Sequence, residues 1–203
     1  QQKESSFLGM WLFLVQEIMF FGGLFVTNAV YRSIYPAAFA VASRELPTWI
    51  GAANTAVLLG SSFTKVIAVW AAQTGRKKWI AYGLILTILH GGVFLGVKVF
   101  EYMAKWDHHL VPGLNFHWDG PEAAHGAEIF FSLYFAMTGM HALHMIVGMV
   151  IMALMIRPAL RGRWTPENHN FVEGFGLYWH FVYIVWIFLF PFLYLLGWSG
   201  GVH

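Results

Sequence analysis

Residues 127–156 read AEIFFSLYFAMTGMHALHMIVGMVIMALMI and contain a single charged side chain, Glu128. A helix needs about 20 apolar residues to cross the ~30 Å hydrocarbon core of a bilayer. The other apolar runs of this kind cover about residues 7–30, 48–72, 78–102 and 173–198. Backbone polar groups in lipid must be hydrogen-bonded within their own segment, so each run is predicted to be a transmembrane helix. The sequence therefore predicts an all-α integral membrane bundle of five helices.

Composition supports this fold class. Hydrophobic residues make up 58% of the chain and charged residues 11%, against about 25% charged residues in a soluble domain. We expect residues 1–203 to form a single transmembrane domain, with any chemistry between helices or at their ends. A net charge of +2 is too small to indicate a nucleic-acid partner. The chain has no cysteine, which excludes disulfides, thiolate metal sites, iron–sulfur clusters and a cysteine nucleophile.

The distribution of cations predicts the orientation in the membrane. One side of a five-span topology carries Lys3, Arg76, Lys77, Lys78, Arg157, Arg161 and Arg163, and the other carries Arg32, Arg44 and Lys105. Cytoplasmic loops are enriched in lysine and arginine. We therefore expect the N-terminus to be cytoplasmic and the C-terminus to be outside.

Glu17 is the polar residue that fits its surroundings least well. It lies about ten residues into the first span, or ~15 Å deep at 1.5 Å per residue. An ionised carboxylate there costs at least about 2.5–3.5 kcal/mol, so Glu17 is expected to be neutral or hydrogen-bonded to another helix. A carboxyl in a proton pathway and a carboxyl that only joins helices are both compatible with this position.

Four histidines lie within predicted spans: His90, His141, His144 and His180. His141, His144 and Gly148 share one helix face at spacings i, i+3 and i+7. Haem or metal ligation would need ligands that converge from facing helices, and no pair recurs at a fixed spacing to indicate this. We favour interhelical hydrogen bonds by these histidines, with Gly139 and Gly148 permitting close helix approach.

Other polar residues have simpler interpretations. Asn54 is expected to hydrogen-bond to a neighbouring helix. Arg157, His169 and Glu173 flank the ends of the last two spans, where an arginine suits a phospholipid phosphate or fixes topology. Lys65 and Lys98 lie near the ends of their spans and are expected to extend toward the interface.

Four blocks, in order along the chain, carry a resemblance to a known family. They are GMWLFLVQEIMFFGG at 9–23, NTAVLL at 54–59, GMHALHMIVG at 139–148, and Glu173 followed by YWHFVYIVW at 178–186. Together they resemble subunit III of cytochrome c oxidase, in the five-helix bacterial form of the haem-copper oxidase subunit III family. The resemblance covers nearly the whole chain.

The resemblance implies a non-catalytic subunit of a proton-pumping terminal oxidase in a bacterial inner membrane. Subunit III carries no haem or copper, which belong to partner subunits I and II. It packs mainly on subunit I and binds phospholipids in a cleft, and it supports proton uptake and stability during turnover. A small subunit IV is a further candidate partner, and membership of a respiratory supercomplex stays open.

The family pattern also suggests roles for particular residues. Glu17 matches the buried carboxyl of the lipid cleft or proton pathway. Residues expected at lipid headgroups or subunit interfaces are Asn54, His141, His144, Arg157, His169, Glu173 and His180. Tyr183 stands where many relatives have an aspartate, so any role of that acid is absent here.

Three alternatives remain open at this point. The chain could be the related subunit of a quinol oxidase or of a nitric oxide reductase, with the same fold in a different complex. It could be a free-standing haem cytochrome that uses the span histidines, or an ion transporter built around Glu17.

Overall fold

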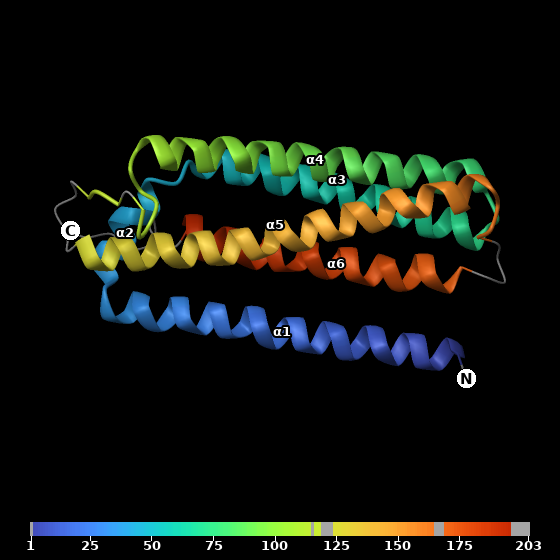
Figure 1. Cartoon of the computed structure of the whole chain (residues 1–203), viewed down its shortest axis with the longest axis horizontal. Helices are drawn as coiled ribbons and strands as arrows, with labels where there is room; N and C mark the ends of the chain where they lie inside the picture. Colours follow the sequence, from blue (N-terminus) through green and yellow to red (C-terminus); the bar gives the residue numbers. More distant parts are fainter. Residues whose placement is uncertain (1, 115, 119–123, 165–168, 196–203) are drawn as a thin grey trace.

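The computed structural model describes residues 2–114, 116–118, 124–164 and 169–195, and these form a long helical bundle (Figure 1). The elements are α1 Gln2–Ile34, α2 Pro36–Arg44, α3 Thr48–Gln73, α4 Lys77–Asp107, α5 Ala124–Leu160, α6 Asn170–Phe190 and the π-helical turn η1 Pro191–Leu195. Five segments are long and apolar enough to cross a membrane. The predicted all-α class with five spans is confirmed.

The helices extend beyond the predicted spans. α1 runs from Gln2 to Ile34, and α5 from Ala124 to Leu160. α2 was not predicted, because its nine residues are too few to give a transmembrane signal. Residues 196–198, the predicted end of the last span, lie outside the described residues.

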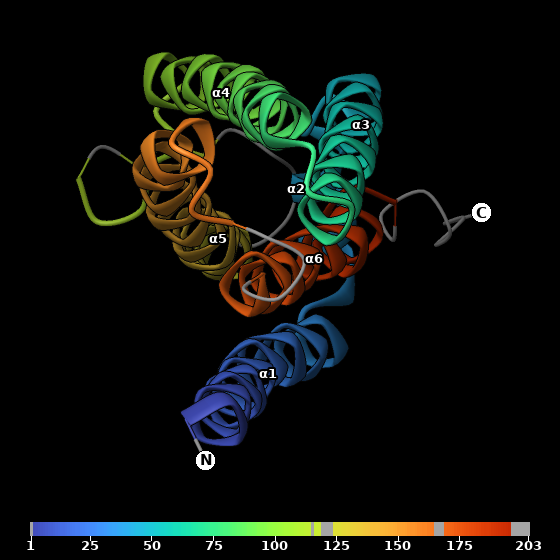
Figure 2. The ribbon, with the colours of Figure 1, turned by 90° about the vertical axis from the view of Figure 1, so that its right-hand side faces the viewer.

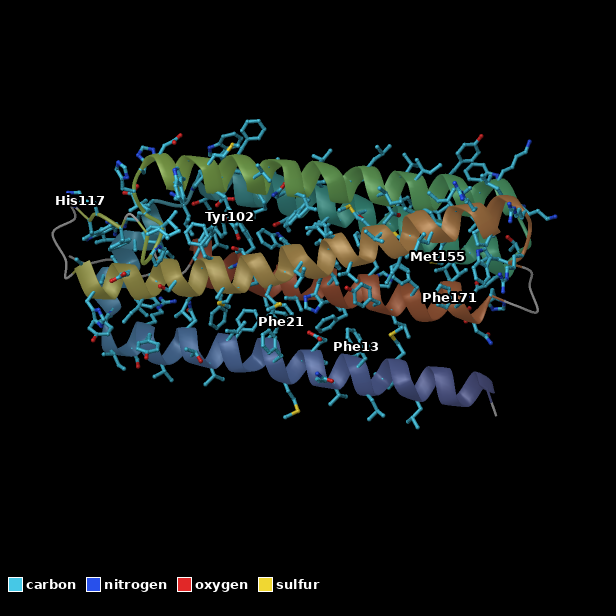
Figure 3. The ribbon with its side chains drawn as sticks, in the orientation of Figure 1. Phe13, Phe21, Tyr102, His117, Met155 and Phe171 are labelled. Atoms are coloured by element: carbon cyan, nitrogen blue, oxygen red, sulfur yellow. The ribbon has the colours of Figure 1, made fainter. Side chains whose placement is uncertain are left out.

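α1 lies apart from the other four long helices. α3, α4, α5 and α6 surround a common core, and α1 packs on the outside of α5 and α6 (Figure 2). Phe13 and Phe21 point from α1 toward this pair (Figure 3). Most of α1 is therefore left for contact with lipid or another protein.

Proline and glycine mark the ends of the elements. Pro36 opens α2 and Pro47 precedes α3, positions where a missing N–H leaves no helical bond unmade. Gly75 and Gly162 adopt positive φ angles of 71° and 72° after α3 and α5, a conformation that glycine adopts without steric cost. Pro191 cannot donate a backbone bond to α6, and the chain continues there as the π-helical turn.

Some glycines permit close helix packing. A Cβ placed on Gly148 would lie 2.8 Å from the Trp179 ring, and one on Gly83 would lie 2.7 Å from the Ala68 Cβ. The prediction for Gly148 is confirmed. The prediction for Gly139 is wrong: the nearest atom to a Cβ there is the Tyr102 hydroxyl at 3.8 Å, an ordinary contact with a side chain that leaves room for a larger residue.

Candidate functional site

Glu17 and His144 meet between α1 and α5. The Glu17 Oε2 atom lies 3.0 Å from His144 Nε2, and both side chains are 14% exposed. The His144 Nδ1 atom is 2.9 Å from the Met140 carbonyl oxygen. The expected interhelical partner of Glu17 is thus identified as the second histidine of the 139–148 block.

The hydrogen-bond pattern fixes how many protons this pair holds. A carbonyl oxygen only accepts, so His144 must donate its Nδ1–H to Met140. A bond between Nε2 and Oε2 then requires one further proton, carried either by the carboxyl or by the imidazole. In both cases the pair is neutral as a whole, which reduces the cost of placing it inside a membrane.

Aromatic side chains surround the pair. The Phe21 ring lies 5.6 Å from the His144 ring in an edge-on arrangement, and Phe13 lies 5.9 Å from Tyr178. The Tyr178 hydroxyl donates to the His144 carbonyl oxygen at 2.9 Å. These contacts bring α1, α5 and α6 together around one carboxyl–imidazole pair.

The other span histidines have separate surroundings. His90 Nδ1 is 2.7 Å from the Leu86 carbonyl oxygen, and His180 Nδ1 shares a 3.1 Å hydrogen bond with the Ser62 hydroxyl. His141 is buried between the rings of Phe94 and Trp186, and neither of its nitrogens has a hydrogen-bond partner among the described residues. The predicted interhelical bond is wrong for His141, because its neighbours on α4 and α6 are aromatic. It is also wrong for His90, whose described bond stays within α4.

The remaining candidate residues lie in two places. Asn54 donates its amide to the Phe94 carbonyl oxygen at 3.4 Å, which links α3 to α4 as predicted. At the far end of the bundle, His169 Nε2 is 3.2 Å from Glu173 Oε1, which also accepts a 2.5 Å bond from Gln73 of α3. Arg157 is exposed near the end of α5.

The two lysines expected to extend to the interface are buried instead. Lys65 is 0% exposed and its Nζ lies 4.8 Å above the Phe175 ring, with no hydrogen-bond partner in the described part of the chain. Lys98 is 4% exposed. The prediction is wrong because the bases of both side chains face the core of α3–α6, where a long stem cannot reach water.

Lys98 belongs to a charged cluster that sequence reasoning missed. Its Nζ donates to Glu101 Oε2 at 2.8 Å and to the Tyr194 hydroxyl at 2.6 Å. Tyr194 in turn donates to Glu101 Oε1. The sequence contained one signal for it, opposite charges three residues apart within an apolar run.

A metal ion or haem would need donor side chains that lie close together. Across residues 2–114, 116–118, 124–164 and 169–195, no three histidine, aspartate or glutamate side chains are grouped as metal ligands would be. Most buried polar side chains instead bind one another or the backbone. Fold and site define a polytopic α-helical membrane protein whose intramembrane polar groups join helices.

Comparison with known proteins identifies the family. The sequence matches the family described as cytochrome c oxidase subunit III over residues 3–199. A cytochrome c oxidase subunit 3 of Synechocystis sp. is 33% identical over 193 residues, covering 93% of this chain and 74% of the relative. A quinol oxidase subunit 3 of Bacillus spizizenii is 33% identical over 201 residues, covering 96% and 89%. A cytochrome bo(3) ubiquinol oxidase subunit 3 of Pseudomonas putida is 30% identical over 197 residues, covering 96% and 87%.

The chain belongs to the cytochrome c oxidase subunit III family, as the four sequence blocks indicated. It is therefore a membrane subunit of a multi-subunit haem-copper oxidase, an oxidoreductase complex of respiration.

Proposed function

We propose that the chain is the non-catalytic subunit III of a proton-pumping cytochrome c oxidase in a bacterial inner membrane. It packs mainly on subunit I, with subunit II and a small subunit IV in the same complex. The haems and copper belong to subunits I and II. The observation that supports this best is the family match over residues 3–199 in a chain whose paired polar groups serve helix contacts.

The proposed orientation and domain organisation follow from the sequence. Residues 1–203 act as a single transmembrane domain, with the N-terminus in the cytoplasm. Arg76, Lys77, Lys78 and the exposed Arg157 then lie on the cytoplasmic side, as the excess of cations requires.

The Glu17–His144 pair is the proposed point of action of this subunit. Its carboxyl and imidazole, 3.0 Å apart, join α1 to α5. A group of this kind can stabilise a proton-uptake path in an adjoining subunit, or fix α1 so that phospholipid beside it is retained. Arg157 and His169, near the cytoplasmic ends of α5 and α6, are suited to phospholipid headgroups. Glu173 and His180, which are partly exposed, are proposed to stabilise subunit interfaces. Asn54 and His141 are buried in the bundle and act between its own helices.

The first alternative is the corresponding subunit of a quinol oxidase. Relatives named as quinol oxidase subunits match as well as the cytochrome c oxidase relative, at 33% identity in both cases. The span residues do not select the electron donor, because donors are oxidised by other subunits in either assignment. A nitric oxide reductase, a free-standing cytochrome and an ion transporter have no comparable observation in their favour.

Replacement of Glu17 by alanine tests the proposed role. We expect initial oxygen consumption of the purified complex to stay nearly unchanged, while its active lifetime shortens or its phospholipid content falls. The physical reason is that His144 Nε2 would remain largely buried without its partner, at a cost of about 1–3 kcal/mol. Oxygen consumption would be followed to inactivation, and bound phospholipid measured on the same preparation.

Two control variants sharpen this experiment. Gln16→Ala removes an exposed side chain from the adjacent position of α1 and should leave the lifetime unchanged. Glu17→Gln keeps a donor to Nε2 but cannot release it as a proton, so it separates a hydrogen-bonding role from a proton-holding one. Unchanged lifetime and lipid content in Glu17→Ala would remove Glu17 from the proposed function.

A further inference from the structure

Lys65 is a buried amine without a counterion among the described residues. Its side chain is 0% exposed, and no described residue forms a hydrogen bond with its Nζ atom. Two other buried lysines are bonded: Lys98 to the carboxylate of Glu101, and Lys105 to a backbone carbonyl oxygen. An ionisable side chain inside a membrane span is rare, and such groups generally have a function.

The hydroxyl groups beside Lys65 on α3 are bonded to other helices. The Thr64 hydroxyl lies 2.9 Å from the Thr87 hydroxyl of α4. The Ser61 hydroxyl accepts the indole N–H of Trp179 at 3.0 Å. Thr87, the α4 residue that contacts this turn of α3, is not titratable, so α4 offers no counterion there.

α6 covers the other side of Lys65, because α3 and α6 lie side by side (Figure 2). The Nζ atom lies 4.8 Å above the Phe175 ring. Gly176 leaves room for the lysine stem, since a Cβ there would lie 3.2 Å from Val69 and 3.9 Å from the Lys65 Cε atom. The amine is therefore held against an aromatic ring between two helices.

Two titratable groups of α6 face the same side of α3. His180, whose ring is partly exposed, shares a 3.1 Å hydrogen bond with Ser62, about one turn from Lys65. Glu173 accepts a bond from Gln73 at the end of α3. Residues 65 to 73 span about 12 Å of helix at 1.5 Å per residue. Lys65 thus has a second base near it, while the carboxylate serves the end of the helix.

An ammonium ion would be poorly stabilised in these surroundings. A buried ion loses its hydration, and only a counterion with further hydrogen bonds compensates for that loss. A single aromatic ring attracts a cation more weakly, and a positive charge on His180 would repel it. The uncharged amine avoids these costs and keeps a lone pair that can bind a proton.

We propose that Lys65 is held between α3 and α6 as an uncharged amine and serves as a proton-accepting site inside the membrane. Protonation adds a proton to the Nζ lone pair and gives an ammonium, with no other bond made or broken. The site is separate from the Glu17–His144 pair, which belongs to α1 and α5. The proposal does not depend on which oxidase contains the chain.

Nitrogen-15 NMR of the purified complex with labelled lysine side chains tests the proposal, because an amine and an ammonium give separate signals. Lys65→Met and Lys65→Leu remove the amine and keep an apolar side chain. The matched control is Lys98→Met combined with Glu101→Leu, which removes a buried lysine that is ion-paired. Spectra would be recorded near neutral pH and then at a series of lower pH values, with assembly of the complex checked at each.

We expect the wild type and the control to give one amine signal per copy of the chain that both Lys65 variants lack. Acidification of the wild type should convert this signal reversibly into an ammonium signal. A wild-type spectrum that matches the Lys65 variants in the amine region would overturn the proposal. An amine signal that stays unchanged down to the lowest pH at which the complex is assembled would also overturn it, because the site would then accept no proton.

Discussion

Replacement of Glu101 by leucine is expected to destabilise the complex-bound chain by about 3–5 kcal/mol, because a buried Lys98 would lose its counterion. Lys98 and Glu101 are both 4% exposed, and their charged atoms are 2.8 Å apart. The Tyr194 hydroxyl, which binds both, would lose its bond to Glu101 and keep its bond to Lys98. For a chain of this length the change corresponds to a fall on the order of 10 °C in melting temperature.

A double variant that removes both charges is the control for this expectation. Lys98→Met combined with Glu101→Leu removes both charges and keeps apolar volume, and such replacements are often neutral or stabilising. We therefore expect the double variant to regain most of the melting temperature that Glu101→Leu loses. Melting would be followed in the purified complex by loss of this chain from the assembly. A double variant as unstable as Glu101→Leu would show that the loss does not come from an unpaired charge.

Replacement of Gly83 by leucine is expected to separate α3 from α4 where Gly83 packs against Ala68. A Cβ at Gly83 would meet the Ala68 Cβ at 2.7 Å and the Ala68 backbone at 3.0 Å. Backbone atoms of a packed helix cannot yield as the end of a flexible side chain can. We expect the free energy of unfolding to fall by about 3 kcal/mol, since overpacking of a filled core typically costs 1–3 kcal/mol and occasionally more.

Gly92→Leu on the same helix is the matched control. A Cβ at Gly92 meets nothing within 4 Å, and leucine has a higher helix propensity than glycine by up to about 1 kcal/mol. The control should therefore be as stable as the wild type or slightly more stable. Melting of the two variant complexes measures the difference, and equal melting temperatures would contradict the packing argument.

The transmembrane helices were predictable because each depends on a local property. An apolar run longer than the bilayer is thick has few alternatives to a helix in lipid, and all five such runs became long helices. α2 was not predictable in this way. It is a short helix whose buried residues, such as Phe39, face the core only because the surrounding chain places them there.

The candidate site was predictable residue by residue but not as a set of contacts. Glu17 was identified by the cost of a carboxyl within a span, and His144 by its place in the 139–148 block. Their pairing depends on how α1 packs on α5, which no local pattern specifies. The same holds for Lys98, since its contact with Tyr194 joins residues 96 positions apart in sequence.

Lys65 was predicted to reach the interface from its distance to the span end, without regard to the direction of its helix face. A lysine near the end of a span reaches water only if its helix face is turned toward lipid or the interface. α3 packs against α4 and α6, so Lys65 points into the bundle beside Phe175. Distance from the span end was therefore a poorer guide than the helix face.

This chain is expected to contribute no redox centre of its own and to work within an oxidase. Affinity purification from native membranes in mild detergent tests this expectation most directly, with companion chains identified by mass. A reduced-minus-oxidised spectrum would be recorded before and after those companions are stripped away. We expect an oxygen-reducing preparation whose haem leaves with a large partner subunit. Haem that stays with this chain after stripping would contradict the account.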